Sequence, residues 1–293
     1  MIARNSAPTT APTTRRMRPS VTPRDLHFQH QAAPSNAWLG GDVVGTAILN
    51  ALSLTFPVGE RLFMDAVRQY RAQLSGRLLD EAQAFIAQEA VHSREHLARN
   101  GALDRARYPV DAIEAEIRER MTRVRERGPM AMLSVTIALE HFTAILADLL
   151  LSDDSLLEGA PPEVARLWRW HAMEETEHKA VAFDVFGEAT KDWTPRRRQR
   201  VRNTVMRIVT VIFVVNVTRY AALLLTGDGM NPAVAKARVL WFLFSEPGPF
   251  RRVWRTYAAW YRDDFHPWDY DNTPRLEAWR ARFPTPAVRH QAA

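Results

Sequence analysis

The sequence contains two Glu-x-x-His pairs, and an isolated glutamate in an apolar segment precedes each of them. The pairs are Glu89-x-x-His92 and Glu175-x-x-His178. The isolated glutamates are Glu60 and Glu140. A spacing of three residues places both side chains of a pair on one face of an α-helix, one turn apart. Two helical hairpins would deliver these six side chains, in this order, to the core of a four-helix bundle as metal ligands.

The absence of cysteine narrows the chemistry of such a site. Disulfides, thiolate zinc sites and cysteine nucleophiles are excluded. A metal would have to be held by histidine and carboxylate side chains, which suit iron or manganese. A single Glu-x-x-His pair arises often by chance on a helix surface. The prediction of a dinuclear metal site therefore depends on the complete set, in order, on apolar helical faces.

Helical periodicity extends through the 293-residue chain, and segments with alternating apolar and polar residues are scarce. Hydrophobic residues make up 46% of the chain, which is enough for a sizeable core. We therefore predict an all-α protein. Three regions are expected: a flexible N-terminal arm that is disordered or wraps the bundle (1–37), a four-helix bundle with the metal site (38–192), and a C-terminal helical extension with a wrapping tail (193–293).

Prolines, glycines and apolar spacing predict the helix boundaries. A short helix over residues 38–54 leads into a bundle helix over 57–75. Pro57 is expected in the first turn of that helix, where a missing N–H has no consequence. Further helices are predicted over residues 79–100, 111–127, 129–151 and 162–190. The strongly charged helix over 111–127 would be the crossover between the two hairpins.

A basic run, RRRQRVR, begins at Arg196 and leads into an apolar stretch over residues 204–225. The stretch is long enough to span a membrane. Arg207, Asn216 and Arg219 interrupt it, however, and arginine near the middle of a membrane is costly. Three interpretations stay open: a transmembrane span, a helix buried against the bundle, and a helix at a membrane surface. Two shorter helices and an aromatic tail with a structural His266 are expected after it.

The order of ligands resembles that of the ferritin-like di-iron carboxylate superfamily over residues 57–189. His171 extends the second pair to His-x-x-x-Glu-x-x-His, which is similar to the arylamine N-oxygenase branch. The segment WRWHAMEETEHKAVAFDVF, with FHPWDYD near the end, also resembles a bacterial family described as predicted metal-dependent hydrolases. The resemblance implies a ferritin-like four-helix bundle with extra C-terminal helices.

The same resemblance implies a ligand set for two metal ions. The candidate ligands are Glu60, Glu89, His92, Glu140, His171, Glu175 and His178. The first metal would take Glu60, Glu89 and His92, and the second Glu140, Glu175 and His178, with His171 as a further ligand of the second. Glu89 and Glu175 would bridge the two. The four carboxylates balance two divalent ions, which are expected to be iron, with manganese or a mixed iron–manganese pair as alternatives.

Metal-bound histidines need a hydrogen-bond partner on their second ring nitrogen. The resemblance gives this role to the residue before each paired glutamate. Glu174 would contact His92, and Gln88 would contact the opposite histidine, His178. His96, one turn after His92, is a further residue expected around the site.

This ligand set favours a di-iron oxidase or oxygenase that uses O₂ to oxidise a small or hydrophobic organic substrate. A first alternative is a metal-dependent hydrolase in which two metals activate a water molecule. A second is a metal-binding bundle without catalytic activity. No catalytic side chains are expected beyond the ligands.

The net charge of +6 and the isoelectric point of about 10.0 come from arginines spread along the chain. This distribution is not typical of nucleic-acid binding. The expected partners are O₂ and a small-molecule substrate, and the electron donor stays open. A homodimer and a peripheral membrane contact through residues 204–225 also stay open. Because an apolar segment of secretory type is missing near the start, the expected location is the cytoplasm, at the membrane surface if that contact forms.

Overall fold

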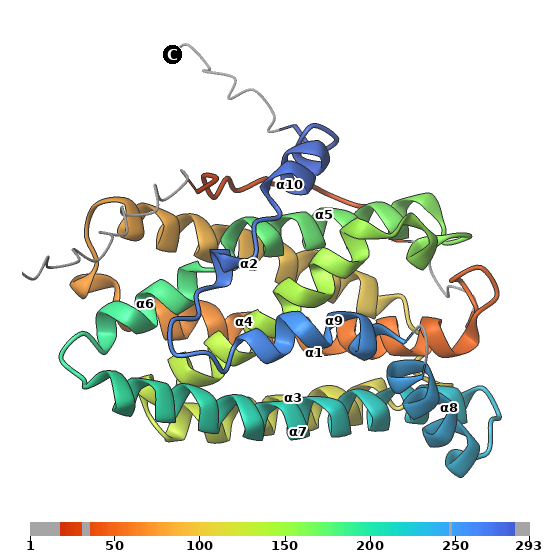
Figure 1. Cartoon of the computed structure of the whole chain (residues 1–293). Coiled ribbons are helices and arrows are strands. Elements are labelled where there is room, and N and C mark those ends of the chain that lie inside the picture. Colours follow the sequence, from red (N-terminus) through yellow and green to blue (C-terminus); the bar gives the residue numbers. More distant parts are fainter. Residues whose placement is uncertain (1–17, 31–35, 246–247, 285–293) are drawn as a thin grey trace, which may run out of the picture.

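The structure is a computed structural model that describes residues 18–30, 36–245 and 248–284. Within these residues the chain forms α-helices and short 3₁₀ helices and no strand, which confirms the all-α prediction. In Figure 1 the long helices lie side by side, with α3 and α7 along one side of the molecule and α10 on the opposite side. The fold is therefore a helical bundle with additional helices around it.

Four helices carry the candidate ligands. They are α1 (Val43–Arg68), α2 (Gly76–Gly101), α4 (Pro129–Ser152) and α5 (Pro162–His178). α1 packs on α2 and α4 packs on α5, while α1 also contacts α4 and α2 contacts α5. The four helices therefore enclose one common core. α3 (Val110–Glu126) connects the two pairs and packs against α1 and α4, as a crossover helix would.

Capping residues explain where two of these helices begin. The Asp42 carboxylate accepts hydrogen bonds from the N–H groups of Val44 and Gly45 at 2.9 and 3.0 Å, which satisfies donors at the start of α1. Before α4, Gly128 has a φ of 90°, a conformation that favours glycine. Pro129 then occupies the first turn, where its missing N–H is tolerated.

α1 continues through Pro57, although the sequence predicted a helix start at this residue. A proline inside a helix leaves the carbonyl four residues earlier without its donor, here the carbonyl of Ser53. The side-chain amide of Asn100 on α2 donates to that carbonyl at 2.9 Å. Because the neighbouring helix replaces the missing donor, α1 continues across the predicted gap. The two helices predicted over 38–54 and 57–75 are therefore largely a single helix.

The single helix predicted over 162–190 is interrupted, and α6 (Val181–Ala189) follows α5 as a separate helix. The break lies at Lys179, where the sequence has neither proline nor glycine. The Lys179 ammonium is buried and donates to the carbonyl of Tyr270 at 2.9 Å and to the side chain of Asn272 at 2.7 Å. These contacts with the C-terminal tail hold the chain at the break.

The C-terminal extension covers the outside of the bundle. It consists of α7 (Pro195–Gly227), α8 (Pro232–Phe244), α9 (Pro249–Ala259) and α10 (Thr273–Arg280). α7 packs on α1 and α4, α9 packs on α4, and α10 packs on α5. Short 3₁₀ helices lie at Arg71–Gln73, Asp154–Leu157 and Pro267–Asp269.

Three of the described helices are long and apolar enough to cross a membrane by length and composition. Two of them, α1 and α4, place candidate ligands in the core. The third, α7, buries 44% of its most apolar 18-residue stretch against the rest of the protein. The opposite face of α7 leaves an apolar stripe exposed, formed by Ile208, Val211, Ile212 and Val215.

The described part of the N-terminal arm, residues 18–30, wraps the bundle without regular secondary structure. Arg24 and Phe28 are buried there. The Phe28 ring lies 5.2 Å from that of Trp170 on α5, and its backbone N–H donates to Glu95 on α2 at 3.1 Å. The arm was expected to be disordered or to wrap the bundle, and residues 18–30 wrap it. Residues 1–17 and 31–35 lie outside the described part.

Candidate metal centre

The seven candidate ligands meet in one buried cluster in the core of the bundle. Their side chains come from α1 (Glu60), α2 (Glu89 and His92), α4 (Glu140) and α5 (His171, Glu175 and His178). None of these residues is more than 4% exposed. Their potential ligand atoms form three overlapping groups, and within each group all atoms lie within 4.8 Å of one another.

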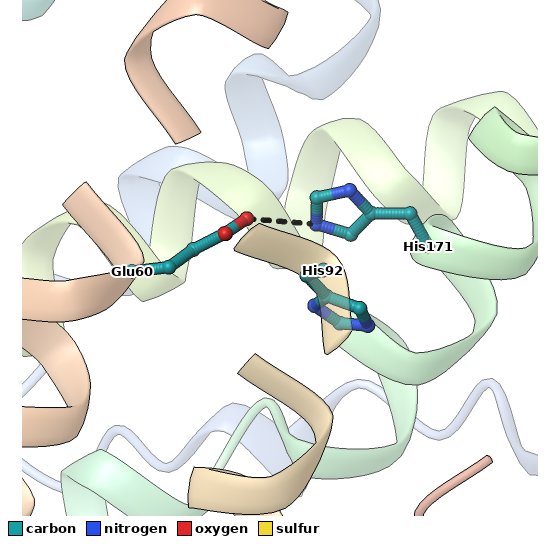
Figure 2. A group of neighbouring side chains, drawn as sticks. All are labelled: Glu60, His92 and His171. Atoms are coloured by element: carbon teal, nitrogen blue, oxygen red, sulfur yellow. Dashed lines mark ion pairs between the residues drawn. The ribbon is translucent and has the colours of Figure 1, made fainter. Parts of the chain in front are cut away.

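The first group consists of Glu60, His92 and His171, which Figure 2 shows converging from three helices. His171 Nε2 lies 3.7 Å from Glu60 Oε1 and 2.9 Å from Glu175 Oε1. Burial lowers the pKa of His171 to about 4, so its imidazole is neutral and can donate a lone pair. The hydroxyl of Ser93 donates to Glu60 Oε2 at 2.8 Å and leaves Oε1 for the cluster.

The second group consists of Glu89, Glu140 and His178. His178 Nε2 lies 3.3 Å from Glu89 Oε1 and 3.5 Å from Glu140 Oε2. Three helices therefore contribute to this group as well, and it lies beside the first.

Glu89 and Glu175 each direct one carboxylate oxygen toward each group. Glu89 Oε1 lies 3.3 Å from His178 Nε2, and Glu89 Oε2 lies 3.8 Å from His92 Nδ1. Glu175 Oε2 lies 3.5 Å from His178 Nε2, and Glu175 Oε1 lies 3.6 Å from His92 Nδ1. These two carboxylates are thus placed between the groups, where bridging ligands would have to lie.

The structure places His171 differently from the prediction, which assigned it to the second metal together with Glu140 and His178. His171 lies instead with Glu60 and His92. An α-helix rises 1.5 Å per residue, so His171 and His178 lie about 10 Å apart along α5, on either side of Glu175. A histidine one turn before the bridging glutamate therefore reaches the first group, while the histidine one turn after it reaches the second.

Several polar atoms of the cluster have no hydrogen-bond partner among the described residues. They are Glu60 Oε1, both carboxylate oxygens of Glu89 and of Glu140, Glu175 Oε2, His92 Nδ1 and His178 Nε2. Buried polar atoms are almost always paired, and a buried carboxylate without a partner is very costly. These unpaired atoms belong to a donor set of carboxylates and imidazoles that suits divalent cations. The residues therefore fit a pair of metal ions.

The pKa values of the carboxyl groups indicate that the cluster lacks compensating positive charge. Burial raises the pKa of Glu60 and of Glu140 well above the usual range, and repulsion between the carboxylates adds to this effect. Burial also raises the pKa of Glu89. Burial would raise the pKa of Glu175 too, but the charge of His178 outweighs it and holds that pKa well below the usual range. Protons or cations must therefore compensate the negative charge of the cluster, and metal ions and protons compete for the same carboxylates and imidazoles.

The outer nitrogens of the paired histidines contact the two residues predicted for them. His92 Nε2 lies 3.1 Å from Glu174 Oε2, and His178 Nδ1 lies 2.9 Å from Gln88 Oε1. Each contact turns the other ring nitrogen toward the cluster. The partner of His92 is a carboxylate and the partner of His178 an amide, so the supports of the two histidines differ in charge.

His96 supports His171 from outside the cluster. His96 Nε2 lies 2.7 Å from His171 Nδ1, and His96 Nδ1 lies 2.8 Å from the hydroxyl of Ser53. Burial lowers the pKa of His96 well below its usual value, and His171 lowers it further. The His96 ring is therefore neutral, and it orients His171 with Nε2 toward the cluster.

Arg24 lies behind the residues that support the histidines, and it was not among the residues predicted from the sequence. Its guanidinium donates to Glu174 Oε1 at 3.0 Å and to both carboxylate oxygens of Glu177, at 2.8 and 3.2 Å. Glu177 Oε2 in turn accepts from the amide of Gln88 at 2.8 Å. One arginine thus connects the supports of both paired histidines. The only local signal was the additional carboxylate of Glu177 beside His178.

A cavity of about 900 Å³ reaches the cluster from the surface. Its lining includes His171 and Glu175 at the inner end and residues of α1, α4, α7, α8 and α9 along the rest. A pocket of this size is typical for a small-molecule site. The candidate metal centre is therefore open to an organic molecule on one side.

Comparison with known proteins gave one match. Residues 22–271 match the family described as predicted metal-dependent hydrolase, and this range includes every candidate ligand. Neither the curated proteins nor the solved structures gave a match. The matched range covers most of the chain, and the ligand cluster at its centre agrees with the family's description. The chain therefore belongs to the family of predicted metal-dependent hydrolases.

Proposed function

We propose that this protein is an enzyme that holds two divalent cations in the cluster and acts on an organic substrate in the adjoining cavity. The observation that supports it most directly is the placement of Glu89 and Glu175, each of which extends one oxygen toward both ligand groups. The cavity beside Glu175 supports an enzyme over a metal-storage bundle, because storage requires no organic pocket.

In this proposal Glu60, His92 and His171 hold one cation. Glu140 and His178 hold the other, and Glu89 and Glu175 are shared. When bound, two cations supply Lewis acidity and a water molecule of lowered pKa. Glu174 and Gln88 fix the tautomers of the paired histidines, while the apolar core keeps bulk water away from the ligands.

Hydrolysis is the reaction that the family description favours. The titratable side chains where the cavity meets the cluster are His171 and Glu175, both of which are candidate ligands. Substrate binding in the cavity would therefore place a scissile bond directly beside the metal positions, with proton transfer left to the carboxylates of the cluster and the bound water.

A second candidate reaction is oxidation of the substrate by O₂. Four carboxylates and three imidazoles are a donor set that suits iron or manganese. The order of ligands also resembles that of ferritin-like di-iron carboxylate proteins, and the cavity beside them is mostly apolar. This reaction would need electrons from a donor as well as O₂.

Metal analysis of anaerobically purified protein, followed by two assays, tests the proposal. A hydrolase would cleave a panel of acyl esters without consuming O₂, would lose activity on chelation and would regain it with metal. An oxidase would consume O₂ after reduction and change its absorption spectrum. Fewer than two metals per chain after reconstitution would contradict both reactions, and absence of both activities across the panel would contradict an enzyme.

A further inference from the structure

The cavity that reaches the cluster has two chemically different ends. Its inner end is formed by buried side chains, among them His171 and Glu175. Its outer end includes Arg238 and Trp241 of α8, and Trp241 is 75% exposed. A molecule that fills the cavity would therefore extend from the protein surface to the candidate metal centre.

The walls between these ends are hydrocarbon. Most of the lining residues are leucine, isoleucine, valine or aromatic, including Ile48, Leu49, Leu52, Leu146, Leu150 and Phe213. A polar group placed there would lose its hydration without gaining a partner. Each methylene group that is buried there gains about 0.8 kcal/mol. The middle of the cavity therefore selects an aliphatic chain.

Small side chains leave room at the inner end. Thr143 and Ala147 of α4 and Ala172 of α5 line the cavity close to Glu175. The Phe56 ring, whose centroid lies 4.8 Å from that of His171, also lines the cavity at this end. The far end of a chain can therefore reach the ligands.

The outer end carries a positive charge for which the described residues provide no ion-pair partner. Arg238 forms no ion pair with the residues that the structure describes. The two aspartates that line the cavity are already engaged: Asp42 caps α1, and Asp153 pairs with Arg252 at 2.8 Å. An anionic group beside Arg238 would therefore find an available partner.

We propose that the cavity binds an aliphatic chain with an anionic end group, with the anion beside Arg238 and the other end of the chain at His171 and Glu175. A free long-chain carboxylate and an anionic phospholipid both have this chemistry. That the bound molecule is the substrate rests on the proposed function, whereas binding itself does not. Hydrolysis would require a chain that also carries an acyl ester bond at the end farthest from the anion, whereas oxidation by O₂ would act on the hydrocarbon end itself.

Tryptophan fluorescence provides a direct test, because Trp168 and Trp241 both line the cavity. The metal-loaded protein is titrated with dibromooctadecanoate, and separately with vesicles of brominated phosphatidylglycerol, because bromine quenches tryptophan only at short range. Unlabelled carboxylates from octanoate to hexadecanoate, below their micelle concentrations, then compete. The expected affinity rises about fourfold per added methylene until the cavity is full, as burial of hydrocarbon requires.

Two variants address the two parts of the ligand. Leu146→Trp fills the middle of the cavity and should weaken binding of the long chains at least tenfold. Leu139→Trp is the matched control, since Leu139 lies two turns earlier on α4, is also half-buried and does not line the cavity. Arg238→Gln should weaken binding of hexadecanoate about tenfold and leave binding of hexadecanol unchanged.

The outcomes separate this inference from the proposed function. Quenching that Leu146→Trp removes and Leu139→Trp retains supports the inference, and the probe that quenches identifies the source of the chain. Absent quenching by both probes, affinity independent of chain length, or equal effects of the two tryptophan variants would overturn it. Chain binding by a protein that takes up no metal would contradict only the proposed function.

Discussion

Arg24 and Glu177 form a two-pronged ion pair, with hydrogen bonds of 2.8 and 3.2 Å, although 153 residues separate them along the chain. Both side chains are buried, with 4% and 0% of their surface exposed. The same guanidinium holds Glu174, the partner of His92. A segment without regular structure thus determines how residues of the bundle core are oriented.

Replacing Arg24 by glutamine should destabilise the metal-free protein by about 3 kcal/mol, because removing one partner of a buried ion pair leaves the other charge uncompensated. The loss is expected near the lower end of the range for buried pairs, since Arg280 also donates to Glu177, at 2.6 Å. Urea denaturation followed by circular dichroism measures the change. Metal affinity should fall about 10- to 100-fold, as for other supports of metal ligands.

Arg94→Gln is the matched control for this substitution. Arg94 of α2 pairs with Asp25 of the arm and with its neighbour Glu95, but 39% of its side chain is exposed. Exposed ion pairs contribute less than about 1 kcal/mol. Equal losses in the two variants would show that Arg24 only attaches the arm.

The shared position of Glu175 predicts that Glu175→Ala abolishes binding of both metals, since one oxygen faces each group. Addition of metal should then no longer raise the melting temperature, because the stabilisation comes from binding to the folded state. Metal analysis and thermal unfolding with and without metal measure both effects. Glu163→Ala, on the more exposed start of α5, should behave as the wild type. Two retained metals in Glu175→Ala would refute the bridging role.

His171→Ala should weaken one metal position and spare the other, because His171 belongs to the group of Glu60 and His92. A calorimetric titration should show one site with wild-type affinity and one weakened site. His96→Gln, which only removes the support of His171, should weaken the same site by less. Unchanged affinity at both sites in His171→Ala would show that this histidine is not a ligand.

The acid stability of the packing between α3 and α7 should depend on Glu116. Hydrogen bonding to Arg219 lowers the pKa of Glu116 from 4.5 to about 2, and Arg120 contributes to the effect. The unfolded state therefore binds a proton more readily than the folded state, so the stabilisation is present above about pH 4.5 and is lost as the pH falls toward 2. Glu116→Gln should lower the melting temperature at pH 7 and have a decreasing effect from pH 4.5 to 3.5.

Glu119→Gln serves as the comparison, since Glu119 pairs with Arg123 on the surface of the same helix and both side chains are more than half exposed. Its effect should be small at every pH. If Glu116→Gln lowers the melting temperature equally at pH 7 and pH 3.5, the ion pair between Glu116 and Arg219 does not have this role.

The exposed stripe of α7 should bind an anionic membrane surface. Val211 and Val215 are 64% and 54% exposed, and the basic run from Arg196 to Arg200 lies at the start of the same helix. The double variant Val211→Asp/Val215→Asp should lose co-sedimentation with phosphatidylglycerol vesicles while keeping its melting temperature. Leu97→Asp, at an exposed leucine of α2, is the control and should still co-sediment with the vesicles. Unchanged sedimentation of the double variant would exclude this stripe.

Features that depend on local spacing could be predicted from the sequence. Glu89 and His92 lie on one face because the helix has a fixed period, and the apolar residues around them turn that face inward. The partner of each histidine came from the resemblance to ferritin-like di-iron proteins, which assigns this role to the residue before each paired glutamate, here Gln88 and Glu174. These relationships require only that the helices form and pack.

Features that depend on distant contacts could not be predicted. Pro57 is tolerated within α1 because Asn100 replaces the lost donor, and α5 breaks at Lys179 because the tail near Asn272 binds its ammonium. The role of Arg24 likewise depends on its contact with Glu177. In each case the deciding partner lies more than 40 residues away.

The candidate ligands and part of the cavity wall lie on different helices, which affects how substitutions can change this protein. All candidate ligands lie on α1, α2, α4 and α5, whereas part of the cavity wall belongs to α8 and α9, which carry none of them. Substitutions at Trp241, Phe242 or Phe250 can therefore alter which molecules enter the cavity while every candidate metal ligand stays in place. A mutant library confined to these two helices would vary which molecules the cavity accepts without changing the candidate metal ligands, which makes this wall the place to begin redesign.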